Sequence, residues 1–212
     1  MREPTRVFAI RHGETAWNVD TRIQGQLDIP LNATGRQQAQ RLAEALRGET
    51  LDAVYASDLT RAADTAAALA AVAGLPVITD TGLRERGFGV FEGLTFNEIQ
   101  QRWPQLSQRW RQRDPLFGPA GGETLDAFYA RCVGCAAELA ERHPGQTIVL
   151  VAHGGVLDCL YRAATRIALQ APRTWLVGNA SINRLLHTPD GFSLVGWSDT
   201  QHLDGLALDE AH

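Results

Sequence analysis

The chain has 212 residues, of which 44% are hydrophobic and 21% are charged, as in an ordinary globular protein. Its net charge of −4 at pH 7 excludes the global basic field that recruits nucleic acid or anionic membranes. No apolar run reaches the roughly 20 residues of a membrane span, the N-terminus is unlike a signal peptide, and three cysteines make an odd count. We therefore expect a cytoplasmic protein without nucleic-acid or membrane partners.

The first part of the chain alternates short apolar runs with helical patterns. The expected elements, in chain order, are a strand at 6–10, a helix at 32–48, a strand at 51–57, a helix at 58–74 and a strand at 75–80. Asn32 or Thr34 is the expected N-cap of the first helix, and Gly48 its stop. Asp58 lies near the expected start of the second helix, and Gly74 ends it. This alternation is typical of an α/β protein with a parallel sheet.

The remainder of the chain begins irregularly and then resumes the alternation. The Trp, Pro and Gly content of the middle predicts a helical insertion with loops, in which 86–120 forms a possible lid over the sheet edge. The elements expected after it are an amphipathic helix at 123–143, a strand at 147–153, a helix beginning at the next glycines, and a hairpin at 183–197. We expect one domain over 1–212, a three-layer α/β/α arrangement with a mixed, mostly parallel sheet.

Two of the expected strands end in the same way. IRHG (10–13) and VAHG (151–154) each place a histidine and then a glycine just past an apolar strand. In open α/β sheets, ligands bind at the carboxyl ends of strands, near helix N-termini. His12 and His153 are therefore expected to face one pocket, and the glycine after each would let backbone N–H groups approach a ligand.

The residues around these histidines favour an anionic ligand. A single histidine of this kind is more often a core residue, but two in matched contexts favour function. Zinc would need a further ligand, and the chain has no HExxH or HxH spacing. Arg11 is unfavourable beside a metal, whereas its planar guanidinium suits phosphate. Arg61, expected in the first turn of a helix, supplies a second guanidinium, and an imidazole can attack phosphorus.

At this point the sequence resembles a known family, the histidine phosphatase superfamily, in the right order over nearly the whole chain. The segments that carry the resemblance are RHGETAWN (11–18), IQGQLDIPL (23–31), SDLTRAADTA (57–66), LRERGFGVFEG (83–93), GGET (121–124) and VAHGGV (151–156). The resemblance implies a phosphoglycerate mutase-like fold and phosphoryl transfer through a phosphohistidine.

The resemblance also implies a role for each matching residue. His12 would be the nucleophile and Glu85 the general acid and base, which protonates the leaving oxygen and then activates water. Composition alone would favour a solvated salt bridge between Glu85 and Arg84 or Arg86. The remaining matches would complete the catalytic and substrate-binding site: Arg11, Asn18, Gln24, Gly25, Arg61, His153 and Gly154.

The compact length favours one branch of this family. True glycolytic mutases of the family look longer after the acid, so we expect a metal-independent phosphomonoesterase acting on a small phosphorylated metabolite. The alternatives are a phosphoglycerate mutase, primed by 2,3-bisphosphoglycerate, and a fructose-bisphosphatase-type sugar phosphatase, which ERGFGVFEGLT resembles. An inactive phosphate-binding module is disfavoured because no expected catalytic residue is replaced. No other cofactor is expected, and the protein would be a monomer or a homodimer paired through its terminal strands.

One further motif receives no functional assignment. Cys132 and Cys135 form a CxxC, but they fall inside the expected helix at 123–143, with no second CxxC and no strand directly before them. Trp103 and Trp110, in the middle segment, are expected to be packing residues, with Trp110 as a possible lining of a substrate lid.

Overall fold

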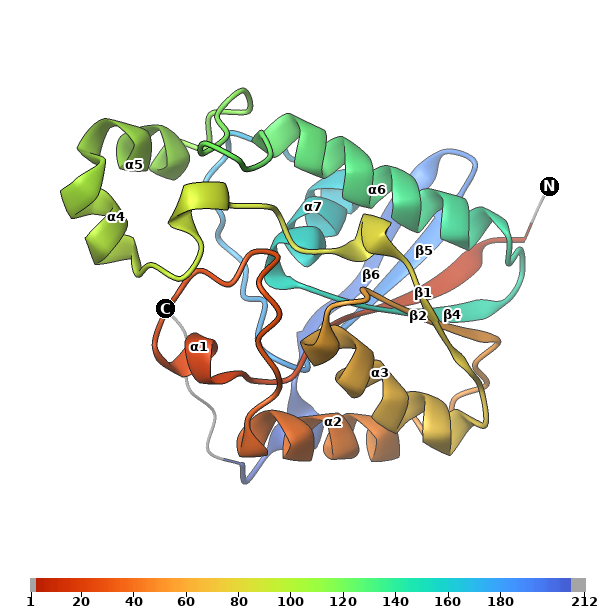
Figure 1. Cartoon of the computed structure of the whole chain (residues 1–212). Coiled ribbons are helices and arrows are strands. Elements are labelled where there is room, and N and C mark those ends of the chain that lie inside the picture. Colours follow the sequence, from red (N-terminus) through yellow and green to blue (C-terminus); the bar gives the residue numbers. More distant parts are fainter. Residues whose placement is uncertain (1–2, 207–212) are drawn as a thin grey trace.

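A computed structural model describes residues 3–206, which build a sheet of six strands in the order β3-β2-β4-β1-β5-β6 (Figure 1). The strands are β1 (Thr5–Arg11), β2 (Ala53–Ala56), β3 (Val77–Thr79), β4 (Thr147–Ala152), β5 (Ile182–Thr188) and β6 (Gly191–Asp199). The first four strands run parallel, and β5 and β6 add an antiparallel hairpin beside β1. The predicted mixed, mostly parallel sheet is confirmed.

Helices cover both faces of this sheet, because its central strands are apolar on both sides. Every residue of β2 and β4 is buried. One face packs against α2 (Ala33–Ala45) and α3 (Thr60–Ala73), and the other against α6 (Leu125–Glu141) and α7 (Gly154–Thr165) (Figure 1). The expected three layers are therefore present.

The structure shows which residues lie at the N-termini of α2 and α3 and what they contact there. Asn32, not Thr34, caps α2, because its side chain accepts a hydrogen bond from the Gly35 N–H at 2.7 Å. Asp58 does not cap α3, which begins at Thr60. It pairs instead with Arg84 at 2.5 Å, a partner 26 residues further along the chain.

The middle segment packs as a small separate cluster beside the carboxyl ends of the strands (Figure 1). It contains α4 (Phe96–Arg102) and α5 (Pro104–Arg111), whose start at Pro104 suits a proline at the first helical position. Trp103 and Trp110 pack around Phe91, so their predicted role in packing is confirmed. A short helix, α1 (Ala16–Val19), lies closer to the start of the chain and was not expected.

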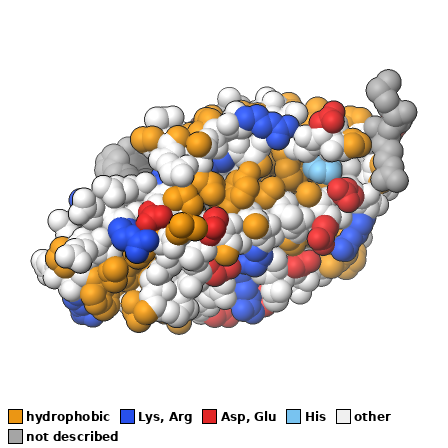
Figure 2. Space-filling model, turned by 90° about the horizontal axis from the view of Figure 1, so that it is seen from above, with side chains coloured by type: hydrophobic (Ala, Val, Ile, Leu, Met, Phe, Trp, Pro, Cys, Tyr) orange, Lys and Arg blue, Asp and Glu red, His pale blue; other side chains and the backbone are white. Residues whose placement is uncertain are grey.

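The face above α6 and α7 carries a band of hydrophobic side chains in its middle (Figure 2). Half-buried apolar residues pack on the core from this side, among them Tyr161 and Trp197, whose rings meet edge to face at 4.7 Å. Beside it β6 forms an edge of the sheet, with Leu194 and Val195 exposed. The expectation of a monomer or a homodimer stays a prediction. None of the helices within residues 3–206 combines the length and the hydrophobicity that a membrane span requires.

Candidate active site

The two His-Gly pairs meet at one end of the sheet. β1 and β4 are parallel neighbours, and Arg11 lies opposite Ala152. The segments that follow the two strands therefore leave the sheet at the same level. The ring centroids of His12 and His153 are 5.2 Å apart, with 58° between the ring planes. Both residues are buried, at 3% and 0% exposure. The predicted meeting of these two histidines is therefore found in the structure.

His12 is held as a neutral imidazole with a defined tautomer. Its Nδ1 lies 2.7 Å from the carbonyl oxygen of Gly13, which can only accept, so Nδ1 carries the proton. Burial, reinforced by the charges of Arg61 and Arg11, holds the pKa of His12 well below its ordinary value. At neutral pH, Nε2 therefore presents an unprotonated lone pair, as a nucleophile requires.

His153 stands directly before α7 and is also neutral. Burial lowers the pKa of His153 well below its ordinary value, and Arg61 and His12 lower it further. Neither ring nitrogen of His153 has a hydrogen-bond partner within the described part of the chain. A buried imidazole without a protein partner can donate to an oxyanion beside it.

Two guanidiniums lie near the histidines, that of Arg61 buried and that of Arg11 half-buried. Arg61 is 1% exposed, and its terminal nitrogens donate to the carbonyls of Leu27 at 2.8 Å and Gly25 at 2.7 Å. Arg11 donates to the Val177 carbonyl at 2.5 Å, and burial lowers its pKa to about 10, which leaves it protonated at neutral pH. Among residues 3–206, the Nε of each arginine is buried without a partner. Both cations are therefore fixed by the protein, with a donor left over for an anion.

Glu85 reaches this cluster from the chain that leads into the middle segment. Its carboxylate accepts hydrogen bonds from the N–H of Gly155 at 3.0 Å and from its own neighbour, the N–H of Arg86, at 2.8 Å. The salt bridge with Arg84 or Arg86 is not formed: Arg84 pairs with Asp58, and the Arg86 guanidinium donates to backbone carbonyls. The carboxylate is therefore fixed at the start of α7.

The loop that Arg61 binds, between α1 and α2, brings Gln24 and Gly25 to the site. Gln24 is 9% exposed, and its Oε1 accepts no hydrogen bond within the described residues. Gly25 has a φ of 52°, and a Cβ there would lie 2.1 Å from Oε1 of Glu92. That oxygen also accepts from the N–H groups of Gln26 and Phe88. Glu92, which sequence reasoning missed, thus ties this loop to the middle segment.

The glycines that follow the two histidines, Gly13 and Gly154, make different contacts. A Cβ on Gly154 would lie 3.6 Å from Nε of Arg11, so this glycine lies beside the cluster. The expectation is wrong for Gly13. Its N–H donates to the Thr65 hydroxyl at 3.0 Å, and a Cβ on it would lie 2.5 Å from the Gly35 carbonyl oxygen. Gly13 therefore permits the close approach of α2 instead of a ligand.

The donor set fits an anion better than a cation. Within residues 3–206, no three His, Cys, Asp or Glu residues are grouped to hold a metal ion. Two protonated guanidiniums at the same place repel a cation and attract a phosphoryl group. Neutralisation of the phosphoryl oxygens and a positioned nucleophile are the main requirements of phosphoryl transfer. Fold and site together define an α/β phosphoryl-transfer enzyme of the phosphoglycerate mutase-like class.

The chain belongs to the histidine phosphatase superfamily (branch 1), whose family model matches residues 7–200. It is 41% identical over 202 residues to phosphoglycerate mutase-like protein 4 of Arabidopsis thaliana, covering 93% of this chain and 86% of the relative. It is 38% identical over 210 residues to a metal-independent phosphoserine phosphatase of the same plant, covering 97% and 86%. The solved phosphoserine phosphatase of Entamoeba histolytica, in complex with 3-phosphoglyceric acid, superposes with a TM-score of 0.84 at 28% identity, covering 94% of this chain and 99% of that one.

Proposed function

We propose that this enzyme hydrolyses small phosphomonoesters, without a metal, through a phosphohistidine at His12. The observation that carries the proposal is the fixed tautomer of His12, because its Nδ1–H bond to the Gly13 carbonyl leaves Nε2 free for attack. The cations Arg61, which is buried, and Arg11, which is half-buried, both act on His12 and are placed to neutralise the phosphoryl oxygens. The metal-independent phosphatase among the relatives supports the same chemistry.

The reaction proceeds in two displacements. Nε2 of His12 forms a bond to phosphorus while the ester P–O bond breaks, and Glu85 donates its proton to the leaving oxygen. Water then attacks phosphorus, Glu85 takes a proton from that water, and the P–N bond breaks to regenerate neutral His12. His153, Asn18, Gln24, and the backbone at Gly25 and Gly154 are proposed to complete the contacts to the phosphoryl group.

Hydrolysis and mutase activity are separated by a direct assay. With 3-phosphoglycerate as substrate, we expect release of free phosphate to exceed formation of 2-phosphoglycerate, with no need for 2,3-bisphosphoglycerate as primer. The physical reason is the short segment 86–120, which we propose as a lid of a single domain: a short lid leaves water able to reach the phosphohistidine. Phosphorus NMR follows both products, and dominant, primer-dependent isomerisation would establish the mutase instead.

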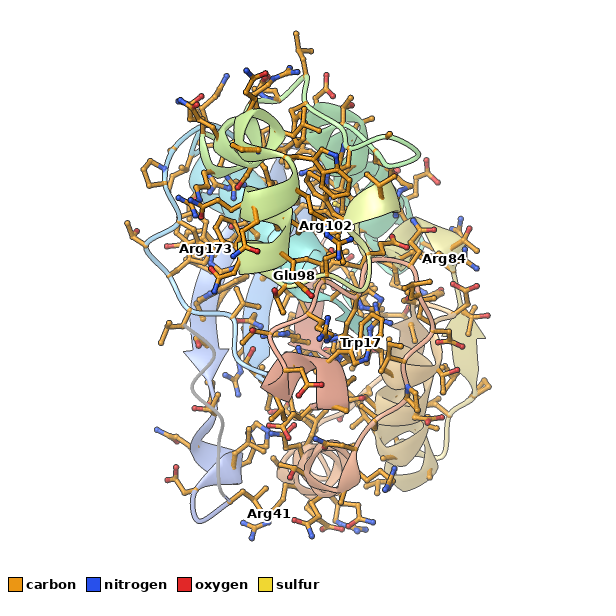
Figure 3. The ribbon with its side chains drawn as sticks, turned by 60° about the vertical axis from the view of Figure 1, so that its left-hand side comes forward. Trp17, Arg41, Arg84, Glu98, Arg102 and Arg173 are labelled. Carbon is orange, nitrogen blue, oxygen red and sulfur yellow. The ribbon has the colours of Figure 1, made fainter. Side chains whose placement is uncertain are left out.

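The surroundings of Arg11 favour substrates with a second negative charge. The Val177 carbonyl binds Arg11, so the loop between α7 and β5 lies against this cation. Arg173 stands exposed on this loop and forms no ion pair within residues 3–206. Its charge is close enough to contribute to the lowered pKa of Arg11, after burial. Figure 3 shows Arg173 on the side of the molecule where α4 carries Glu98 and Arg102.

We propose that Arg173 attracts a carboxylate of the substrate, a group that phosphoserine and 3-phosphoglycerate share. Arg173→Ala is expected to raise KM for both by about fivefold, as for the loss of one exposed ion pair worth about 1 kcal/mol. KM for p-nitrophenyl phosphate, which lacks a carboxylate, should stay unchanged. Arg142→Ala, at an exposed arginine beyond the far end of α6, is the matched control. An equal rise in KM for all three substrates would contradict a specific interaction between Arg173 and the substrate carboxylate.

A further inference from the structure

The turn before β5 lies against the end of β1 that carries His12. The N–H of Ala180 donates to the carbonyls of Arg11 at 3.0 Å and His12 at 3.2 Å, and the Ser181 N–H closes the turn on the Gly178 carbonyl. Asn179 lies inside this turn and is half-buried. Its side chain is therefore held next to the proposed nucleophile by backbone contacts on both sides.

The side chain of Asn179 joins two parts of the site. Its Nδ2 donates to the His12 carbonyl at 3.0 Å and to Oδ1 of Asn18 at 3.3 Å. A carbonyl oxygen can only accept, so the NH₂ group, and not the oxygen, must face it. The orientation of the Asn179 amide is thus determined by its surroundings.

The orientation of the Asn18 amide follows by the same reasoning. Its Oδ1 accepts hydrogen bonds from the Thr15 N–H at 3.0 Å and the Thr15 hydroxyl at 3.0 Å, in addition to Asn179. A backbone N–H can only donate, so the atom that faces it is the oxygen. The three donors gather at Oδ1, and Nδ2 of Asn18 donates no hydrogen bond to the described residues.

We propose that Asn179 is a positioning residue for phosphoryl transfer. By binding Oδ1 of Asn18, it directs Nδ2 of Asn18 toward the phosphoryl group as a donor, and it steadies the backbone of His12 with the same NH₂ group. Asn179 acts through Asn18 and His12 and makes no contact with the substrate itself. This inference rests on the proposed function, because it assigns Asn18 to the phosphoryl group.

A double-mutant cycle between Asn179 and Asn18 tests this role. Asn179→Ala is expected to lower kcat/KM about tenfold in the wild-type background but only about twofold in Asn18→Ala, because the donor that it orients is then gone. The inhibition constant of inorganic phosphate should rise by similar factors in Asn179→Ala, in Asn18→Ala and in the double variant. Asn97→Ala, at an exposed asparagine of α4, is the matched control and should behave as wild type.

The cycle separates positioning from a general structural role. A tenfold loss in both backgrounds, or no loss in either, would overturn the inference while wild-type activity stands. Asn179→Leu keeps the approximate size of the side chain and removes its donors without adding a charge beside the anion site, so it must show the same coupling and replaces the alanine variant if thermal unfolding reveals a folding defect. Failure of the proposed function is distinct, because the wild-type protein itself would then release no phosphate.

Discussion

Replacing His12 by alanine is expected to slow phosphate release by at least about 10⁴-fold, because the nucleophile is lost and no other unprotonated nitrogen is oriented in its place. His153, 5.2 Å away between ring centroids, follows another strand, β4, and lacks the carbonyl contact that fixes the tautomer of His12. The guanidiniums of Arg11 and Arg61 remain, so KM is expected to change far less than kcat. Steady-state release of phosphate from p-nitrophenyl phosphate measures both constants.

A matched histidine variant controls for general effects of the substitution. His143 lies just past the C-terminal end of α6, where it contacts Tyr55 and Gln146, and it takes no part in the site. His143→Ala is therefore expected to retain wild-type kcat. If His12→Ala retained kcat within about tenfold of wild type, covalent catalysis at this residue would be ruled out.

Replacing Glu85 by glutamine is expected to slow phosphate esters of alcohols about 10²- to 10³-fold, but p-nitrophenyl phosphate less than about tenfold. An alkoxide leaving group needs a proton at the moment of cleavage, whereas p-nitrophenolate is stable without one. The amide oxygen of glutamine can still accept from the Gly155 N–H, one of the two bonds that hold the carboxylate, and only the bond from the neighbouring Arg86 N–H is lost, so the fold should tolerate the change.

Substrates with different leaving groups test whether Glu85 donates a proton to the leaving oxygen. The ratio of kcat/KM for phosphoserine to that for p-nitrophenyl phosphate should fall about tenfold or more in Glu85→Gln. Glu138→Gln, at an exposed carboxylate on α6, should leave the ratio unchanged. Equal losses for both substrates would show that Glu85 binds or positions substrate without transferring a proton.

Elements that bury apolar side chains were predictable from the sequence, whereas those fixed by polar contacts were not. The buried strand β4 and the hairpin of β5 and β6 follow from runs of apolar and alternating residues. The helix α1 has only four residues and no apolar periodicity that could reveal it in the sequence. It is stabilised instead by the capping box of Thr15 and Asn18. Asp58 lies near the expected start of α3, but its carboxylate pairs with Arg84, a tertiary contact that the local sequence does not indicate.

The meeting of the two histidines was predictable because it depends only on where parallel strands end. The tautomer of His12 and the orientation of Glu85 were not, because each depends on a single backbone group whose position is set by the folded chain. Asn179 lies 167 residues from His12, and no spacing in the sequence joins them. The close approach of Gly13 to the Gly35 carbonyl also exists only in the folded chain. The sequence therefore wrongly indicates that Gly13 makes room for a ligand.

The most direct test of a phosphohistidine is to trap it during turnover. Rapid acid-free quenching of the enzyme with a phosphomonoester, followed by peptide mass spectrometry, is predicted to find a phosphoryl group on His12 that survives base and is lost in acid. The adduct should appear before the first turnover is complete and be absent from His12→Ala. Turnover without any adduct on His12, or an adduct confined to another residue, would contradict the account.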